Sequence, residues 1–347
     1  WISSLSMFLC AILLIECLGN PMEVFSASAL TGFEQTEMEY GTAISDIVSD
    51  NTAKGYTLSD IRYDFCEIDY SNYANAEVRR EALASAYLSS AGGQLDRGSV
   101  SDSDILYDPY VSAPDAITNV RNQGSTDTCW AFATTAAGEI SSIRQGLTDR
   151  TQWLSPYHMA YFLYHHVTDP LGGTAGDTNV AVTTSTPDFL QAGGNIFMAL
   201  FHMSGWNGLV KEEKAPYDEY VKQGTILADS DAYNGDVLLK NGYIISTGEN
   251  QVQDIKQAIV DYGGVAIQFR ADSQYKNGVT GAYYCNTSGT NHAAVIVGWD
   301  DNYSADNFNA SCRPSANGAW IIKNSWGSSQ GRAGYNFVSY EDQSIAF

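Results

Sequence analysis

The sequence predicts an α+β protein of two lobes, a helical lobe followed by a β-rich lobe, with an active site in the cleft between them. Stretches whose apolar residues recur at helical spacing come first in the core of the chain, and short strand-like runs follow. This order favours segregated helices and strands over an alternating parallel architecture. The chain has 347 residues, of which 44 % are hydrophobic, so it can bury a sizeable core.

The predicted elements have recognisable start and stop signals. Thr128 or Asp127 is expected to cap a helix that begins at Cys129 and ends near Gly146. A serine followed by a proline at residues 155 and 156 is typical of the cap and first position of a second helix. Two more helices are predicted over residues 195–203 and 252–262. Strands are predicted over residues 242–246, 265–269, 293–299, 320–323 and 334–340.

Charge and residue spacing exclude some functions. The chain carries 18 basic and 40 acidic residues, a formal net charge of -22, which argues against nucleic acid as the main partner. Residues 300–306 alternate oxygen ligands as a calcium loop does, but the glycine and distal glutamate of such a loop are absent, so a solvated surface loop is favoured. Four histidines lie among aromatic residues without metal-site spacing, and we expect no metal and no cofactor: His158, His165, His166 and His202.

The first 29 residues are expected to form a secretory signal peptide. Residues 5–18 are mostly apolar, and small residues follow, ending in Ala27-Ser28-Ala29. The apolar run is too short to span a bilayer well, and a buried N-terminal helix is the alternative. Because the sequence starts at Trp1 and its first cation is Lys54, we expect it to be truncated at its start. A secreted or cell-surface protein, with no membrane span in the mature form, is therefore predicted.

Residues 30–112 are expected to form a pro-region or a spacer. This stretch is polar and acidic, with one candidate helix over residues 76–89 and a linker-like run over residues 92–104. It is too long for a simple linker and too polar for a convincing core. A pro-region would keep the following domain, residues 113–347, inactive until cleavage, whereas a spacer would have no effect on activity.

Three short segments hold residues of complementary chemistry. Cys129 follows an Asn-Gln-Gly-Ser run that contains Gln123, and His292 opens a strand-like run. Asn324 lies in an Asn-Ser-Trp-Gly turn together with Trp326. A thiol attacks as its thiolate, and a helix N-terminus or a nearby imidazolium lowers the thiol pKa.

The remaining residues of these segments have candidate supporting roles. Asn324 is a candidate to orient His292, with Trp326 shielding their hydrogen bond from water. The Gln123 amide and the Cys129 backbone N–H are candidates to stabilise an oxyanion. Each residue alone is more often structural, but the joint occurrence favours nucleophilic catalysis by a thiol.

Together these motifs resemble those of the papain family of cysteine peptidases. The resemblance covers roughly residues 113–342 and implies a helical left lobe and a β-rich right lobe. It implies catalytic roles for four residues: Cys129, His292, Asn324 and Gln123. It also implies that a glycine pair before a helix binds the substrate backbone beside the P2 pocket, although such a pair is also an ordinary turn: Gly193 and Gly194. Trp326 is a further candidate for substrate binding.

The sequence departs from the common papain pattern at several points. Thr126 stands where the family usually has a cysteine, so the common left-lobe disulfide is not expected. The distance along the chain from Cys129 to His292 exceeds the usual spacing of about 130–150 residues. A polar insertion over residues 300–318 resembles the bacterial exported branch found in clostridia, in which a lectin-like or wall-binding region often follows. We therefore expect the chain to be truncated after Phe347 and to associate with the cell wall through a region beyond it.

These observations favour a secreted cysteine endopeptidase, made as a zymogen, that hydrolyses protein or peptide substrates through a Cys129 acyl-enzyme. Two alternatives are a non-catalytic adhesin or binding protein on the same scaffold and a Cys-His peptidoglycan amidase or transpeptidase. The complete Cys-His-Asn-Gln set argues against the first, and the motifs around Gln123 and Asn324 argue against the second. Cys285 and Cys312 flank the strand-like run of His292, so they are either bridged or two free thiols.

Overall fold

The computed structural model describes residues 64–67, 99–101, 103–165, 167, 188–205, 207–245 and 251–345, with the backbone alone for residues 64–67. Contacts between residues divide the chain into residues 1–58 and 59–347, and the described residues belong to the second unit. The predicted signal segment, residues 1–29, and the predicted helix over residues 76–89 lie outside the described residues.

The α-helices of the described residues are α4 (Pro109–Ser112), α5 (Cys129–Arg144), α6 (Pro156–Tyr164), α7 (Ile196–Ser204), α8 (Tyr217–Gln223) and α9 (Gln251–Tyr262). The four predicted helices are confirmed as α5, α6, α7 and α9. Ser155 caps α6 by accepting a hydrogen bond from the His158 N–H at 3.1 Å. Thr128 occupies the N-cap of α5, but its side chain makes no capping hydrogen bond. The predicted set lacks α8, although Pro216 before it and the left-handed Gly224 after it are typical helix boundaries.

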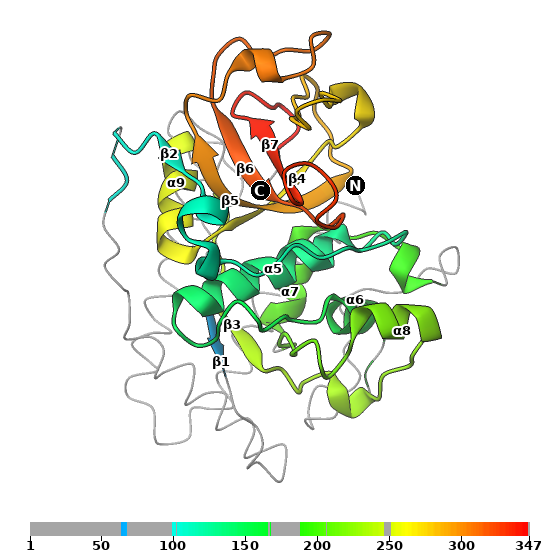
Figure 1. The fold of residues 1–347 in the computed structure, drawn as a ribbon. Coiled ribbons are helices and arrows are strands. Elements are labelled where there is room, and N and C mark those ends of the chain that lie inside the picture. Colours follow the sequence, from blue (N-terminus) through cyan, green and yellow to red (C-terminus); the bar gives the residue numbers. More distant parts are fainter. Residues whose placement is uncertain are drawn as a thin grey trace, which may run out of the picture. The chain divides into compact units, whose positions relative to one another are not determined.

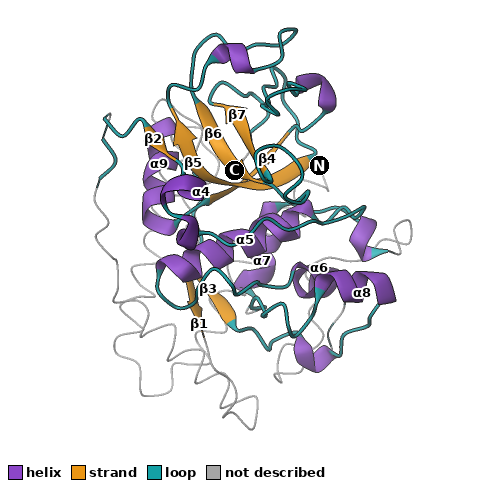
Figure 2. Ribbon diagram, in the orientation of Figure 1, coloured by secondary structure: helices purple, strands orange, loops and turns teal. Residues whose placement is uncertain are grey.

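The strands of the described residues form one large antiparallel sheet and one smaller pair (Figure 2). The large sheet contains β2 (Leu106–Tyr107), β4 (Val265–Phe269), β5 (His292–Asp300), β6 (Ala319–Lys323) and β7 (Tyr335–Ser339). Its order is β2-β5-β6-β7, and β4 pairs with the first half of β5. The smaller pair joins β1 (Asp64–Glu67) to β3 (Val237–Asn241). This mixed α+β architecture confirms the predicted fold class.

The strand predicted over residues 242–246 is wrong in position. β3 covers Val237–Asn241, and residues 242–245 are irregular. The backbone partners explain the difference, because Val237 pairs with β1 and also forms a bridge with Leu209. Strand propensity in the apolar run Tyr243-Ile244-Ile245 therefore does not decide where the strand forms; the backbone pairing of Val237 does.

Helix α5 is the central element of the described structure. It contacts β5 in the sheet as well as α6 and α7, and it runs between the sheet and these helices (Figure 1). Trp130 and Ile140 on α5 are fully buried, and the core cluster around them includes Val295 of β5. A helix that is apolar around most of its surface belongs inside a core. This packing fixes the N-terminal end of α5, and therefore Cys129, next to the sheet.

Residues just before position 113, where the predicted domain of residues 113–347 starts, also contribute to the large sheet. β2 pairs with the end of β5, and the Trp299 Nε1–H donates to the Asp104 carbonyl oxygen at 2.6 Å. Asp108 accepts two hydrogen bonds from the Arg332 guanidinium, at 2.6 and 2.9 Å. A Cβ at Gly298 would lie 2.1 Å from the Tyr107 carbonyl oxygen, so this close approach requires glycine. Residues 104–108 are thus held by strand pairing, hydrogen bonds and an ion pair.

Candidate active site

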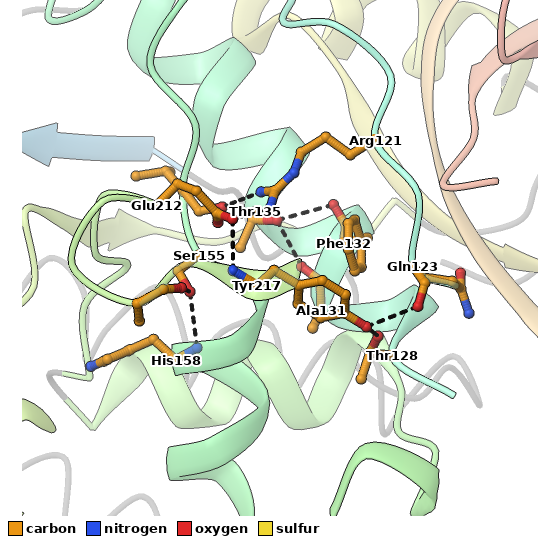
Figure 3. A network of polar contacts seen from close by, with 12 residues as sticks. Arg121, Gln123, Thr128, Ala131, Phe132, Thr135, Ser155, His158, Glu212 and Tyr217 are labelled. Atoms are coloured by element: carbon orange, nitrogen blue, oxygen red, sulfur yellow. Dashed lines mark hydrogen bonds and ion pairs between the residues drawn. The ribbon is translucent and has the colours of Figure 1, made fainter. Parts of the chain in front are cut away.

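The first residue of α5 is Cys129, which is half-buried. A residue of α8 holds the turn before Cys129 in place. The Tyr217 hydroxyl lies 2.8 Å from Thr128 Oγ1 and 2.6 Å from Thr126 Oγ1. Thr128 therefore uses its hydroxyl in this cluster and not as a helix cap (Figure 3). The local sequence thus places a thiol at a helix N-terminus whose conformation is fixed by tertiary hydrogen bonds.

The sheet brings His292 and Asn324 together. His292 begins β5, and Asn324 directly follows the last residue of β6. The His292 Nε2 lies 2.8 Å from Asn324 Oδ1, and both side chains are buried. The Trp326 ring stacks on the imidazole with a centroid distance of 4.2 Å and an interplanar angle of 25°. The predicted neighbours of His292 therefore surround it in the structure.

The thiol lies beside the same strand. The backbone of Ala293, the residue after His292, lies close enough to the Cys129 sulfur to lower the pKa of the thiol. Because Nε2 of His292 faces Asn324, Nδ1 is the ring nitrogen left for proton exchange with a thiol. The arrangement has the three components of a nucleophile, a base and an orienting amide.

Gln123 ties the segment before Cys129 to the turn after Asn324. Its Oε1 accepts a hydrogen bond from the Ser325 hydroxyl at 2.7 Å, and its backbone N–H donates to the Ser325 carbonyl oxygen at 2.8 Å. Its Nε2 donates one hydrogen to the Thr126 carbonyl oxygen at 2.7 Å. The amide is thus anchored at both ends.

Gly194, the second residue of the predicted glycine pair, packs against Trp130. Both residues have positive φ, 74° for Gly193 and 146° for Gly194. A Cβ on Gly194 would lie 2.4 Å from the indole of Trp130, the residue next to Cys129. The Tyr164 hydroxyl donates to the Gly193 carbonyl oxygen at 3.0 Å. Glycine at position 194 therefore lets the backbone lie against Trp130.

Burial opposes charge on both members of the thiol–imidazole pair. Burial raises the pKa of the Cys129 thiol, and backbone hydrogen bonds from Ala293 and Trp130 lower it by less. Burial lowers the pKa of His292 to about 4, and the hydrogen bond to Asn324 acts in the opposite direction. Desolvation alone therefore favours the neutral pair, so an ion pair requires the mutual attraction of thiolate and imidazolium to offset it.

A network of buried and half-buried polar and charged side chains includes Arg121, Glu212 and Tyr217 (Figure 3). Arg121 pairs with Glu212 at 2.6 Å, and Glu212 accepts a hydrogen bond from the Tyr217 N–H at 2.7 Å. Glu139 on α5 accepts from the Leu154 N–H at 2.8 Å. A small pocket between α5 and the sheet is lined by residues that include Arg121, Glu139, Lys323, Asn324 and Ser325. These supporting residues are scattered along the sequence. Lys323 alone has a sequence signal, because it directly precedes Asn324.

Four other sequence predictions concern metal ligands, a membrane span, the loop of residues 300–306 and the pair of cysteines at positions 285 and 312. Within the described residues, no group of three or more His, Cys, Asp or Glu side chains could hold a metal ion, and no helix is long and apolar enough to cross a membrane. In the loop of residues 300–306, Asp306 pairs with Arg313. Cys285 and Cys312 are both free thiols.

A cysteine at the start of a central helix, near a buried His–Asn pair at one end of an antiparallel sheet, is the arrangement that the resemblance to papain-like cysteine peptidases implies. The model of the Papain family cysteine protease matches residues 190–345, a range that includes His292 and Asn324 and begins after Cys129. A cysteine protease of Blomia tropicalis is 25 % identical over 233 residues, which are 66 % of this chain and 60 % of that protein. Cysteine proteinase 1 of Zea mays is 26 % identical over 294 residues, 82 % of this chain and 71 % of that protein.

Solved structures agree with these relatives. The clostridial cysteine protease Cwp84 after propeptide cleavage aligns with a TM-score of 0.55 and 25 % identity, over 70 % of this chain and 55 % of that chain. A structure of the cysteine protease and lectin-like domains of Cwp84, a surface layer associated protein of Clostridium difficile, shares the fold with a TM-score of 0.54 and 23 % identity, over 81 % of this chain and 59 % of that one.

The chain is similar to papain family cysteine proteases in both sequence and fold. It spans little more than half the length of several curated relatives that it matches, 54 % for a cysteine proteinase of Pisum sativum.

Two histidines outside the site are deeply buried in the helical part of the structure. His158 Nε2 lies 2.8 Å from the Asp231 carbonyl oxygen, and His158 Nδ1 has no hydrogen-bond partner among the described residues. Burial lowers the pKa of His158 to about 4 and that of His202 to about 3. His165 stacks on Tyr161 with a centroid distance of 3.7 Å, and His166 lies outside the described residues.

We predict that these two histidines make the protein less stable in mild acid. Their folded-state pKa values lie below the unfolded value of about 6.5, so the unfolded chain binds protons first as pH falls. Their contribution to stability is complete above about pH 6.5 and is lost as pH falls towards 4. Urea unfolding should give a free energy lower by about 2 kcal/mol per histidine at pH 5 than at pH 7.

Glutamine variants provide the control for this prediction. His158→Gln and His202→Gln should each flatten the dependence of the unfolding free energy on pH, because glutamine does not titrate. An unchanged pH dependence in both variants would contradict the assignment to these two side chains.

Proposed function

We propose that this protein is a cysteine endopeptidase that hydrolyses peptide bonds in protein or peptide substrates. The observation that carries the proposal is the buried hydrogen bond of 2.8 Å between His292 and Asn324, shielded by Trp326 and placed beside the Cys129 thiol. A binding protein on this scaffold has no need of an imidazole oriented in this way.

The proposed reaction begins with transfer of the Cys129 proton to Nδ1 of His292 and attack of the sulfur on the scissile carbonyl carbon. The tetrahedral intermediate collapses to an acyl-enzyme as the His292 imidazolium gives its proton to the leaving amine. His292 then takes a proton from water as the water oxygen attacks the thioester carbon, and the imidazolium returns this proton to the Cys129 sulfur as the acid product leaves. Asn324 holds the Nε2 side of the imidazole throughout.

Two donors are available for the oxyanion of the intermediate. The Cys129 N–H belongs to the first turn of α5, where N–H groups have no acceptor within the helix. The Gln123 amide has a second Nε2 hydrogen besides the one donated to Thr126. Preorganised donors of this kind are effective because they need no rearrangement as charge develops. The backbone at Gly193 and Gly194, beside Trp130, is the proposed contact for the extended substrate, and Trp326, which stacks on the His292 ring, is a second proposed contact.

Secretion and latency are further parts of the proposal. The apolar segment within residues 1–29, with its small-residue end, supports export. The structural neighbour Cwp84 is a surface layer associated protein, which is in line with a secreted or cell-surface location for this chain. Residues 30–112 are proposed to contain a pro-region.

The first prediction concerns the nucleophile. Cys129→Ala should reduce hydrolysis of a fluorogenic peptide by about 10⁴-fold or more, with an unchanged circular dichroism spectrum. Asn324→Ala should cost less, on the order of 10–100-fold, because nucleophile and base remain while orientation is lost. Cys312→Ala, which removes another half-buried free thiol, is the matched control and should keep full activity. Normal turnover by Cys129→Ala would rule out the proposed function.

A second prediction addresses the protonation state of the pair. The His292 imidazolium should hold the Cys129 pKa below the free-thiol value of about 8.5, against the effect of burial. Alkylation of Cys129 by iodoacetamide should therefore follow an ionisation well below pH 8.5, and in His292→Ala it should follow one above that value. A single ionisation near or above pH 8.5 in the unaltered protein would show that the neutral pair predominates.

The third prediction concerns latency. Because β2 and α4 pack on the sheet, a form that starts near residue 99 retains all of these contacts. This form should be at least about tenfold more active than one that starts near residue 30, since the proposed pro-region would otherwise occupy the cleft. A form that starts at residue 113 should unfold at lower temperature because it lacks β2 and α4. Equal activity of the two longer forms, both correctly folded, would identify residues 30–98 as a passive spacer.

A further inference from the structure

Asn336 is a buried residue on β7 that belongs to none of the sequence motifs. Its side chain is 1 % exposed. Its Oδ1 accepts a hydrogen bond from Asn324 Nδ2 at 3.1 Å, and its Nδ2 donates to the Gly281 carbonyl oxygen at 3.1 Å. With the bond between Asn324 and His292, this makes a continuous chain of buried hydrogen bonds from Gly281 to the imidazole.

The Gly281 carbonyl oxygen, at the end farthest from His292, sets the donor and acceptor of every hydrogen bond in this series. A backbone carbonyl oxygen can only accept, so Gly281 fixes the Asn336 amide with Nδ2 towards it and Oδ1 towards Asn324. Oδ1 of Asn336 can only accept, so it fixes Asn324 with Nδ2 towards β7 and Oδ1 towards His292. An Asn324 oxygen next to Nε2 favours the tautomer in which Nε2 carries the hydrogen. Nδ1 is then unprotonated and able to accept the thiol proton.

The local structure is shaped around this amide. A Cβ on Gly331 would lie 2.6 Å from Asn336 Nδ2, and one on Gly281 would lie 3.1 Å from it. The Gly281 carbonyl belongs to a tight loop in which the Gly281 N–H donates to the Asn277 carbonyl oxygen at 2.9 Å. The Tyr283 N–H, just after this loop, donates to the Phe337 carbonyl oxygen of β7 at 2.8 Å. The acceptor at the far end of the chain is thus anchored to the strand that carries Asn336.

A second contact supports the same orientation of Asn324 without replacing Asn336. The Ser325 N–H donates to Asn324 Oδ1 at 2.8 Å, which keeps that oxygen on the His292 side. It leaves Asn324 Nδ2 in need of an acceptor in a buried environment, and Asn336 supplies one. A buried amide hydrogen without an acceptor is costly, so loss of Asn336 favours movement of the Asn324 side chain.

We propose that Asn336 is a positioning residue for the reaction: through Asn324 it sets the tautomer and orientation of His292. It touches neither substrate nor the reacting atoms. The inference about the tautomer stands on the hydrogen-bond chain alone, and its consequence for turnover rests on the proposed peptidase function.

Nuclear magnetic resonance of the imidazole tests the positioning role without any assay of hydrolysis. The chain has five histidines, so ¹⁵N-histidine labelling and a His292→Gln reference spectrum assign the signal. All variants of this test carry Cys129→Ala, so that no thiol can protonate Nδ1, and the Cys129→Ala parent should show the neutral Nε2–H form of His292 with a slowly exchanging Nε2–H proton. Asn336→Leu should lose that proton signal and increase the Nδ1–H form.

Three further variants complete this test. Asn207→Leu removes another buried asparagine, whose amide donates to the His202 carbonyl oxygen at 3.2 Å, and should leave the His292 signal unchanged. Asn336→Asp keeps an acceptor for Asn324 and should retain the Nε2–H form. Asn336→Ser is too short to join Asn324 to Gly281 and replaces the leucine variant if that variant does not fold.

A double-mutant cycle tests the route through Asn324. Asn336→Leu should lower kcat about tenfold with little change in KM. When Asn324→Ala is already present, adding Asn336→Leu should lower kcat by less than about twofold. An equal loss in both backgrounds, or an unchanged His292 tautomer in the leucine or serine variant, would overturn the proposal. If the tautomer shifts as expected while the unaltered protein hydrolyses no peptide, the positioning role stands and the proposed function fails.

Discussion

The antiparallel pairing of β5 with β6 is the constraint on which the site depends. In such a pair the start of one strand lies beside the end of the other, so His292 at the start of β5 meets Asn324 just after β6. Burial of α5 against β5 then brings Cys129 to the same end of the sheet. Residues far apart in the sequence are thus assembled by strand register and helix packing.

Burial gives this site both its order and its main energetic cost. The imidazole lies between the Trp326 ring and the Asn324 amide, and few water molecules can compete for its hydrogen bond. The same burial raises the Cys129 pKa and lowers the His292 pKa, so charge separation is favourable only when both charges form together. A fixed imidazole orientation strengthens that mutual attraction, which is why the hydrogen bonds behind Asn324 matter to the chemistry.

Local sequence signals predict much of this structure because each reports on nearby residues. Capping residues predict the helix starts at Cys129 and Pro156. A run of apolar residues predicts the strand of His292. What escapes such analysis depends on tertiary partners: β3 is set by β1 and Leu209, and the Thr128 hydroxyl binds Tyr217 instead of capping α5. Asn336 lies in an ordinary strand pattern, and only the fold shows that it faces Asn324.

Active-site labelling tests the central claim most directly. The protein starting near residue 99 would be treated with an epoxysuccinyl inhibitor and digested for mass spectrometry, with His292→Ala as the comparison. We predict one adduct, on Cys129, that forms much more slowly in the variant, and no adduct on the other two free thiols, Cys285 and Cys312. An unmodified Cys129, or equal labelling of Cys312, would contradict a thiol activated by its position at α5 and by His292.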